Sequence, residues 1–85
     1  MMTFPQKIIS LIQENSDKAG DITPETDIWK DIQIDSLDFL MIVDAIEDEF
    51  NIAITDEAVK KVRTISALCA KLEEMFPGIS DEYRG

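Results

Sequence analysis

Apolar residues recur at helical spacing in three segments of the chain, and no pair of segments has the pattern of paired strands. We therefore predict helices over about residues 3–15, 36–50 and 65–75, with a short helix over about 56–62 between the last two. The apolar positions that define the three long helices are Phe4, Ile8, Leu11 and Ile12, then Phe39, Val43, Ile46 and Phe50, widened by Leu40 and Ala45, and finally Ile65, Leu68, Cys69, Leu72 and Met75.

Polar residues at the predicted helix ends support these boundaries. Thr3, Asp35, Thr55 and Thr64 precede the four helices, and short polar side chains of this kind accept hydrogen bonds from unpaired N–H groups of the first turn. Asn51 is suited to end the second helix in a left-handed conformation. Pro77 and Gly78 end the last helix.

A long connection separates the first two long helices. A loop of this length is unusual in a small domain, so we expect it to pack through its own apolar residues. These residues are Ile22, Ile28, Trp29, Ile32 and Ile34. We expect Trp29 to hold the loop on the helices through packing, and Cys69 to be a buried structural cysteine.

The length of 85 residues predicts one all-α domain. We place this domain at residues 1–78 and expect residues 79–85 to form a polar, flexible tail.

The composition narrows the possible functions. Eighteen acids and eight bases give a net charge of −10, which disfavours binding to nucleic acids and anionic membranes and favours basic partner surfaces. The absence of histidine removes the commonest general base and the commonest transition-metal ligand. With a single cysteine, no apolar run long enough to span a bilayer and no signal-peptide pattern, we expect a protein of the cytoplasm. We also expect it to be a monomer.

Ser36 is the candidate functional residue. A serine near a helix start is usually a cap, but Asp35 is better placed to cap this helix, with Asp38 three residues later. Ser36 then falls at the first helical residue with its hydroxyl free to face solvent. Because no histidine can activate it as a nucleophile, we interpret Ser36 as a serine that another enzyme modifies.

The residues 27–50, DIWKDIQIDSLDFLMIVDAIEDEF, resemble the modification-site region of acyl carrier proteins, and the resemblance continues through ITDEAVKKVRTI at residues 54–65. It implies a small four-helix bundle with a long loop between the first two helices and a short third helix. It also implies that Ser36 carries a covalent 4′-phosphopantetheine arm derived from coenzyme A, with Asp35 and Leu37 recognised beside it. The chain would then be a carrier and not an enzyme, holding acyl intermediates of fatty-acid or polyketide-like biosynthesis as thioesters.

The same resemblance implies docking by a phosphopantetheinyl transferase and by acyl-transferring or chain-elongating enzymes. Residues 31–59 contain nine acids and no lysine or arginine, so these enzymes would approach with basic surfaces. The candidate docking residues are Asp38, Met41, Asp44, Glu47, Asp48, Asp56 and Glu57, next to Leu37.

Three positions depart from the family pattern. Gln33 stands where a glycine is common, Met41 where an acid is common, and Asp44 where an apolar residue is common. The changes at Met41 and Asp44 weaken the expectation of a housekeeping role in fatty-acid synthesis and leave room for a specialised carrier that serves another acyl pathway. An aminoacyl or peptidyl carrier, and an acidic helical adaptor that carries no prosthetic group, are the alternatives.

Overall fold

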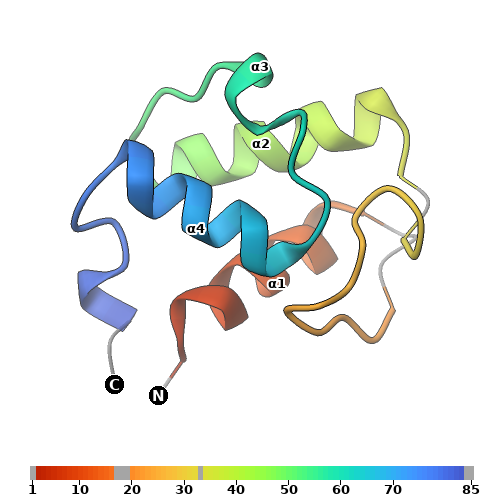
Figure 1. Ribbon diagram of the computed structural model, residues 1–85, viewed down its shortest axis with the longest axis horizontal. Helices are drawn as coiled ribbons and strands as arrows, with labels where there is room; N and C mark the ends of the chain where they lie inside the picture. The colour runs from red at the N-terminus through yellow and green to blue at the C-terminus, as the bar shows by residue number, and fades with distance from the viewer. Residues whose placement is uncertain (1, 17–19, 33, 84–85) are drawn as a thin grey trace.

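Four α-helices make up the chain in the computed structural model, which describes residues 2–16, 20–32 and 34–83 (Figure 1). These are α1 (Phe4–Asn15), α2 (Ser36–Phe50), α3 (Asp56–Val59) and α4 (Ile65–Met75), followed by a short 3-10 helix, η1 (Asp81–Tyr83). Helix α1 packs against both α2 and α4, and α3 packs against α4. The predicted all-α fold is confirmed: the described residues contain no strand and only one isolated bridge, between Asp27 and Thr64.

Side-chain caps set the helix starts where the sequence predicts them. The Thr3 side chain accepts a hydrogen bond from the Gln6 backbone, and the Gln6 side chain accepts one from Thr3 in return. The Thr64 hydroxyl accepts from the backbone N–H of Ala67 at 3.0 Å. At the end of α2, Asn51 adopts the predicted left-handed conformation with φ of 54°.

Helix α3 is shorter than predicted and ends at Val59 instead of near residue 62. The reason lies in the loop that precedes α2. The Val62 carbonyl accepts a hydrogen bond from the Trp29 indole N–H, and the Arg63 carbonyl accepts one from the backbone N–H of Ile28. These bonds hold residues 62 and 63 against the loop, and after Val59 the chain follows a turn in which the Val62 N–H donates to the Val59 carbonyl, three residues back, at 3.3 Å.

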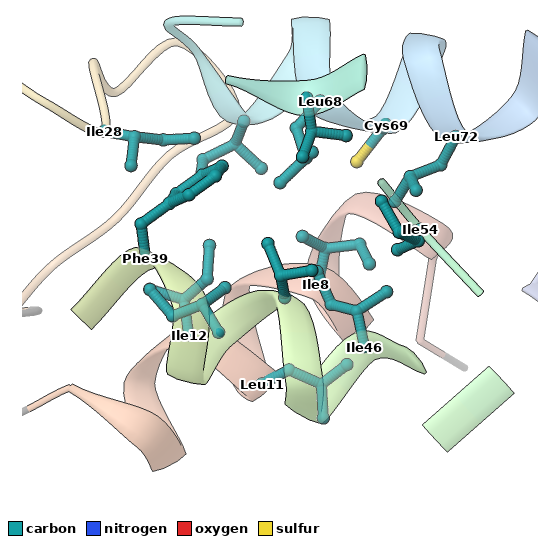
Figure 2. Close-up of a cluster of buried hydrophobic side chains, with 14 of the residues drawn as sticks. Ile8, Leu11, Ile12, Ile28, Phe39, Ile46, Ile54, Leu68, Cys69 and Leu72 are labelled. Atoms are coloured by element: carbon teal, nitrogen blue, oxygen red, sulfur yellow. The ribbon is translucent and has the colours of Figure 1, made fainter. Parts of the chain in front are cut away.

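The core lies between α1, α2, α4 and the long loop (Figure 2). On α2 the buried residues are Phe39, Ile42, Val43 and Ile46, whereas Leu40, predicted to widen this face, is 39% exposed. Ile42 is four residues before Ile46 and shares its face, while Leu40 lies about 120° away around the helix. The prediction was therefore wrong in including Leu40 and in omitting Ile42.

The long loop packs as predicted. Ile28, Ile32 and Ile34 are buried in the core, and Ile22 and Trp29 are partly buried against it. The Trp29 ring lies on Phe39 with centroids 4.7 Å apart, and its indole N–H donates to Val62 at 3.0 Å. Trp29 therefore fastens the loop to both α2 and the segment after α3. Gln33 lies outside the described residues.

Asp27 is the polar centre of this attachment. Its carboxylate accepts hydrogen bonds from the backbone N–H groups of Lys30 and Trp29 and from the side chain of Arg63, at 2.8, 2.9 and 3.0 Å. These donors lower the pKa of Asp27, with the bond from Lys30 contributing most. The negative form of Asp27 thus favours the folded arrangement of the loop.

Residues 79–83 contact the helical domain. Ser80 is buried, and the Tyr83 ring lies 6.2 Å from that of Phe4 and 6.1 Å from that of Phe50, measured between centroids. The boundary at residue 78 and the flexibility of the whole tail stay predictions. In its described part, however, Tyr83 packs on the helices, a contact that the polar composition of the tail did not indicate. No helix among the described residues is long and apolar enough to cross a membrane.

Candidate functional site

Ser36 is the first residue of α2 and is exposed to solvent. It does not cap the helix, because the Asp35 carboxylate accepts the hydrogen bond from the backbone N–H of Asp38 at 2.9 Å. The Asp38 carboxylate in turn accepts from the backbone N–H of Asp35 at 3.5 Å. The predicted capping by Asp35 is confirmed. The cap leaves the Ser36 hydroxyl available beside N–H groups that favour a negative charge.

The chain has five serines, and their environments differ. Ser16 and Ser80 are buried, Ser10 is half-buried, and Ser36 and Ser66 are exposed. Ser66 also lies in the first turn of a capped helix, α4. A pocket distinguishes the two exposed serines, because Ser36 lines one and Ser66 lines none of the pockets described below.

The pocket at Ser36 has a volume of about 130 Å³ and is mostly apolar. Trp29, Phe39 and Leu40 provide its apolar lining, and Lys60, from the turn after α3, also lines it. A dry cavity of about 150 Å³ is enough to hold a benzene molecule, so this pocket has room for one small branched or cyclic group. The sequence did not lead us to Trp29 or Lys60 as site residues. The signal for Lys60 was its place as the first base after 29 residues without one.

A second surface feature is an open groove of about 590 Å³ between α1 and α2. Met41, Asp44 and Asp48 of the candidate docking residues line it. Glu14 of α1 lines it too, an acid that the sequence did not connect to α2. Glu49, also in the lining, forms an ion pair with Lys7 of α1 at 2.9 Å.

Apolar side chains lie within this acidic surface. Leu37 is 66% exposed and Met41 is 47% exposed. Together with Asp44 and Asp48 they occur at intervals of three and four residues, so they form one ridge along the solvent side of α2. The structure therefore brings four of the predicted recognition and docking residues onto a single ridge.

Other candidate docking residues have structural contacts. The Glu47 carboxylate accepts a hydrogen bond from the backbone N–H of Ile54 at 2.8 Å, which ties the segment before α3 to α2. Asp38 belongs to the capping box of α2. Glu57 is exposed on α3, away from the ridge, beside Lys60 and Lys61. Asp56 begins α3, and its side chain lies outside the described part of the structure.

Cys69 is buried in the core as predicted. Burial raises the pKa of its thiol to about 12. Among the described residues, no group of three or more histidine, cysteine, aspartate or glutamate side chains is arranged to hold a metal ion.

Comparison with known proteins assigns the family. A family model described as "Phosphopantetheine attachment site" matches residues 6–72, a span that runs from α1 into α4 and contains Ser36. The acyl carrier protein of Helicobacter hepaticus is 33% identical over 73 residues, which cover 86% of this chain and 96% of that protein. The cofactor of such proteins is covalently attached 4′-phosphopantetheine, and an exposed serine hydroxyl beside a small apolar pocket fits its attachment. The chain therefore belongs to the acyl carrier protein family.

Proposed function

We propose that this protein carries acyl groups on a 4′-phosphopantetheine arm attached to Ser36. The observation that carries the proposal is the exposure of the Ser36 hydroxyl at the start of α2, where Asp35 performs the capping. The thiol at the end of the arm supplies the chemistry, because it holds acyl groups as thioesters. We propose fatty-acid or related polyketide-like biosynthesis as the setting, and the name of the Helicobacter hepaticus relative, an acyl carrier protein, supports an acyl cargo.

Attachment requires a partner enzyme. The Ser36 oxygen forms a bond to the phosphorus that bears the pantetheine of coenzyme A, and the bond from that phosphorus to the adenosine bisphosphate breaks. Adenosine 3′,5′-bisphosphate leaves, and the serine proton passes to a base of the transferase, since this chain has no histidine. The role of this chain is to present the hydroxyl and to favour the negative charge of the product beside the N-terminus of α2.

After attachment the protein acts as a tether and not as a catalyst. A tethered substrate reaches a docked enzyme at an effective concentration that is set by the length of the arm. We place this activity in the cytoplasm, where a single buried cysteine suits a reducing environment.

We propose that partner enzymes dock on the ridge formed by Leu37, Met41, Asp44 and Asp48. The ridge begins beside Ser36, so an enzyme bound there has the arm within reach. Exposed leucine and methionine side chains provide apolar contact, while the carboxylates attract basic partner surfaces. Glu14 extends the acidic surface onto α1. The docking roles of Glu47, Asp38, Asp56 and Glu57 stay predictions.

The attachment site is tested by intact-mass spectrometry after incubation with coenzyme A and a phosphopantetheinyl transferase. We expect the wild-type protein to gain the mass of one phosphopantetheine group and the Ser36→Ala variant to gain none. The matched control is Ser66→Ala, which removes the other exposed serine in the first turn of a helix and should be modified normally. Modification of Ser36→Ala, or failure of the wild-type protein to be modified by a transferase active on other carriers, would overturn the proposal. The mass of the protein purified from its own cells would then identify the cargo.

A further inference from the structure

The pocket at Ser36 combines one positive charge with an apolar interior. Lys60 is the only basic residue in the described part of its lining, and Trp29, Phe39 and Leu40 supply the apolar surface. Lys60 follows the last residue of α3 and is exposed, and no carboxylate of the described residues forms an ion pair with it. Among the described residues its side chain therefore has no ionic partner, and it lines the same pocket as Ser36.

This combination matches the root of the proposed arm. A phosphodiester on Ser36 carries one negative charge, and the pantetheine next to it begins with a methylene group followed by a carbon that bears two methyl groups. The phosphate would lie at the rim, within the reach of a lysine side chain, and the methyl groups would be the first apolar part to meet the pocket. A volume of about 130 Å³ is enough for a group of this size.

Trp29 is bonded to the backbone close to Lys60. The indole N–H of Trp29 donates to the carbonyl of Val62 at 3.0 Å, only two residues after Lys60. The other side of the pocket is fixed as well, because the Trp29 ring lies 4.7 Å from the ring of Phe39, which is buried on α2. The indole, the lysine and the serine thus come from three segments that are joined at this point.

We propose that Lys60 and Trp29 hold the root of the phosphopantetheine arm against the protein. Lys60 pairs with the phosphodiester on Ser36, and the dimethyl-bearing carbon rests against Trp29 in the pocket. The inference depends on the proposed attachment at Ser36 and adds which residues orient the arm once it is there. Because the ion pair is exposed, it favours the docked arm over the free arm by about 1.5- to 5-fold and leaves the arm able to leave for a partner enzyme.

Trp29 makes the inference measurable, since it is the only tryptophan of the chain. We expect the tryptophan emission to change between the unmodified and the modified wild-type protein. In Lys60→Gln this change should be smaller, by up to about 5-fold when the docked arm is the minor state, and raised salt should reduce it in the wild-type protein. The unmodified Lys60→Gln protein should have the emission of the unmodified wild type, which shows that the pocket itself is intact.

Lys61→Gln is the matched control. Lys61 is the next residue, is also exposed and has the same charge, but it does not line the pocket at Ser36; it lines a neighbouring surface pocket together with Glu57 and Lys60. We expect Lys61→Gln to respond to modification as the wild-type protein does. In addition, nuclear Overhauser contacts between the two methyl groups of the arm and the Trp29 ring should be present in the wild-type protein and weaker in Lys60→Gln.

The outcomes separate this inference from the proposed function. If Ser36 gains no mass, the proposed function fails before the pocket is tested. If Ser36 is modified but the emission of Trp29 does not change and no methyl contact appears, the arm does not rest in the pocket and the inference is wrong. An equal loss of the response in Lys60→Gln and Lys61→Gln would show general charge and not a specific pair.

Discussion

At the scale of single residues, Cys69 gives a direct chemical prediction. The thiol is buried, and its pKa is raised to about 12 because burial disfavours the thiolate. At pH 8 only about one part in ten thousand of such a thiol is ionised, compared with about a quarter of an ordinary thiol. We therefore expect alkylation of the native, unmodified protein to be at least about a thousandfold slower than alkylation of the protein in urea.

The arm provides the internal control for this experiment. Protein loaded with phosphopantetheine should show one thiol that reacts at the ordinary rate, because the arm ends in an exposed thiol. The number of alkylated thiols per protein can be followed over time by intact-mass spectrometry. Native alkylation of Cys69 at the unfolded rate would mean that the cysteine is not buried in solution.

Among single residues, the exposure of Ser36 could be predicted from the sequence, whereas the contact of Glu47 could not. The position and exposure of Ser36 followed from Asp35 as a better cap, which depends only on neighbours along the chain. The role of Glu47 did not follow, because its partner, the N–H of Ile54, is seven residues away and across a turn. The sequence does not distinguish a glutamate that faces solvent from one that accepts a hydrogen bond from a distant backbone N–H. Its contacts have to be seen in three dimensions.

At the scale of elements, the attachment of the long loop gives a prediction for Asp27. Replacement by asparagine keeps an acceptor oxygen but removes the charge that binds Arg63 and the N–H groups of Lys30 and Trp29. We expect Asp27→Asn to unfold at a slightly lower temperature than the wild-type protein at pH 7. Thermal unfolding followed by circular dichroism measures the difference.

The pH dependence of this difference has a defined sign. The folded protein lowers the pKa of Asp27, so the charged carboxylate contributes stability above its ordinary pKa of about 3.9. That contribution is lost as the pH falls through the lower pKa of the folded state, where the wild-type side chain also becomes neutral. The two proteins should therefore converge in acid. Asp21→Asn, at an exposed loop position, is the control, and its unfolding temperature should match that of the wild-type protein at pH 7 and in acid.

Most elements could be predicted from the sequence because their determinants are local. The spacing of apolar residues located α1, α2 and α4, and Thr3, Asp35 and Thr64 fixed their first residues. The end of α3 could not be predicted, since it depends on hydrogen bonds from Trp29 and Ile28 in the distant loop. The pocket at Ser36 was missed for the same reason, because its lining comes from the loop, α2 and the turn after α3.

At the scale of the whole molecule, the negative charge is unevenly distributed along the chain. The net charge is −10, and the stretch of residues 31–59 holds nine acids without a base. The fold adds Glu14 of α1 to the groove beside Asp44 and Asp48. An uneven distribution of this kind directs the approach of a basic partner as well as attracting it.

Position and net charge can be separated by a pair of charge reversals. Asp48→Lys and Glu73→Lys each change the net charge by the same amount, and both residues are exposed, but Asp48 lies on the α2 ridge and Glu73 on α4. We expect Asp48→Lys to lower kcat/KM for modification by the transferase several-fold at an ionic strength of about 0.01 M, where charges act over about 30 Å. The loss should shrink near 0.15 M, where that range is about 8 Å.

Glu73→Lys should lose less kcat/KM at low salt, because its charge is not where the partner docks. Equal losses in the two variants would mean that only the total charge matters, and unchanged rates in Asp48→Lys would remove the ridge as the docking surface.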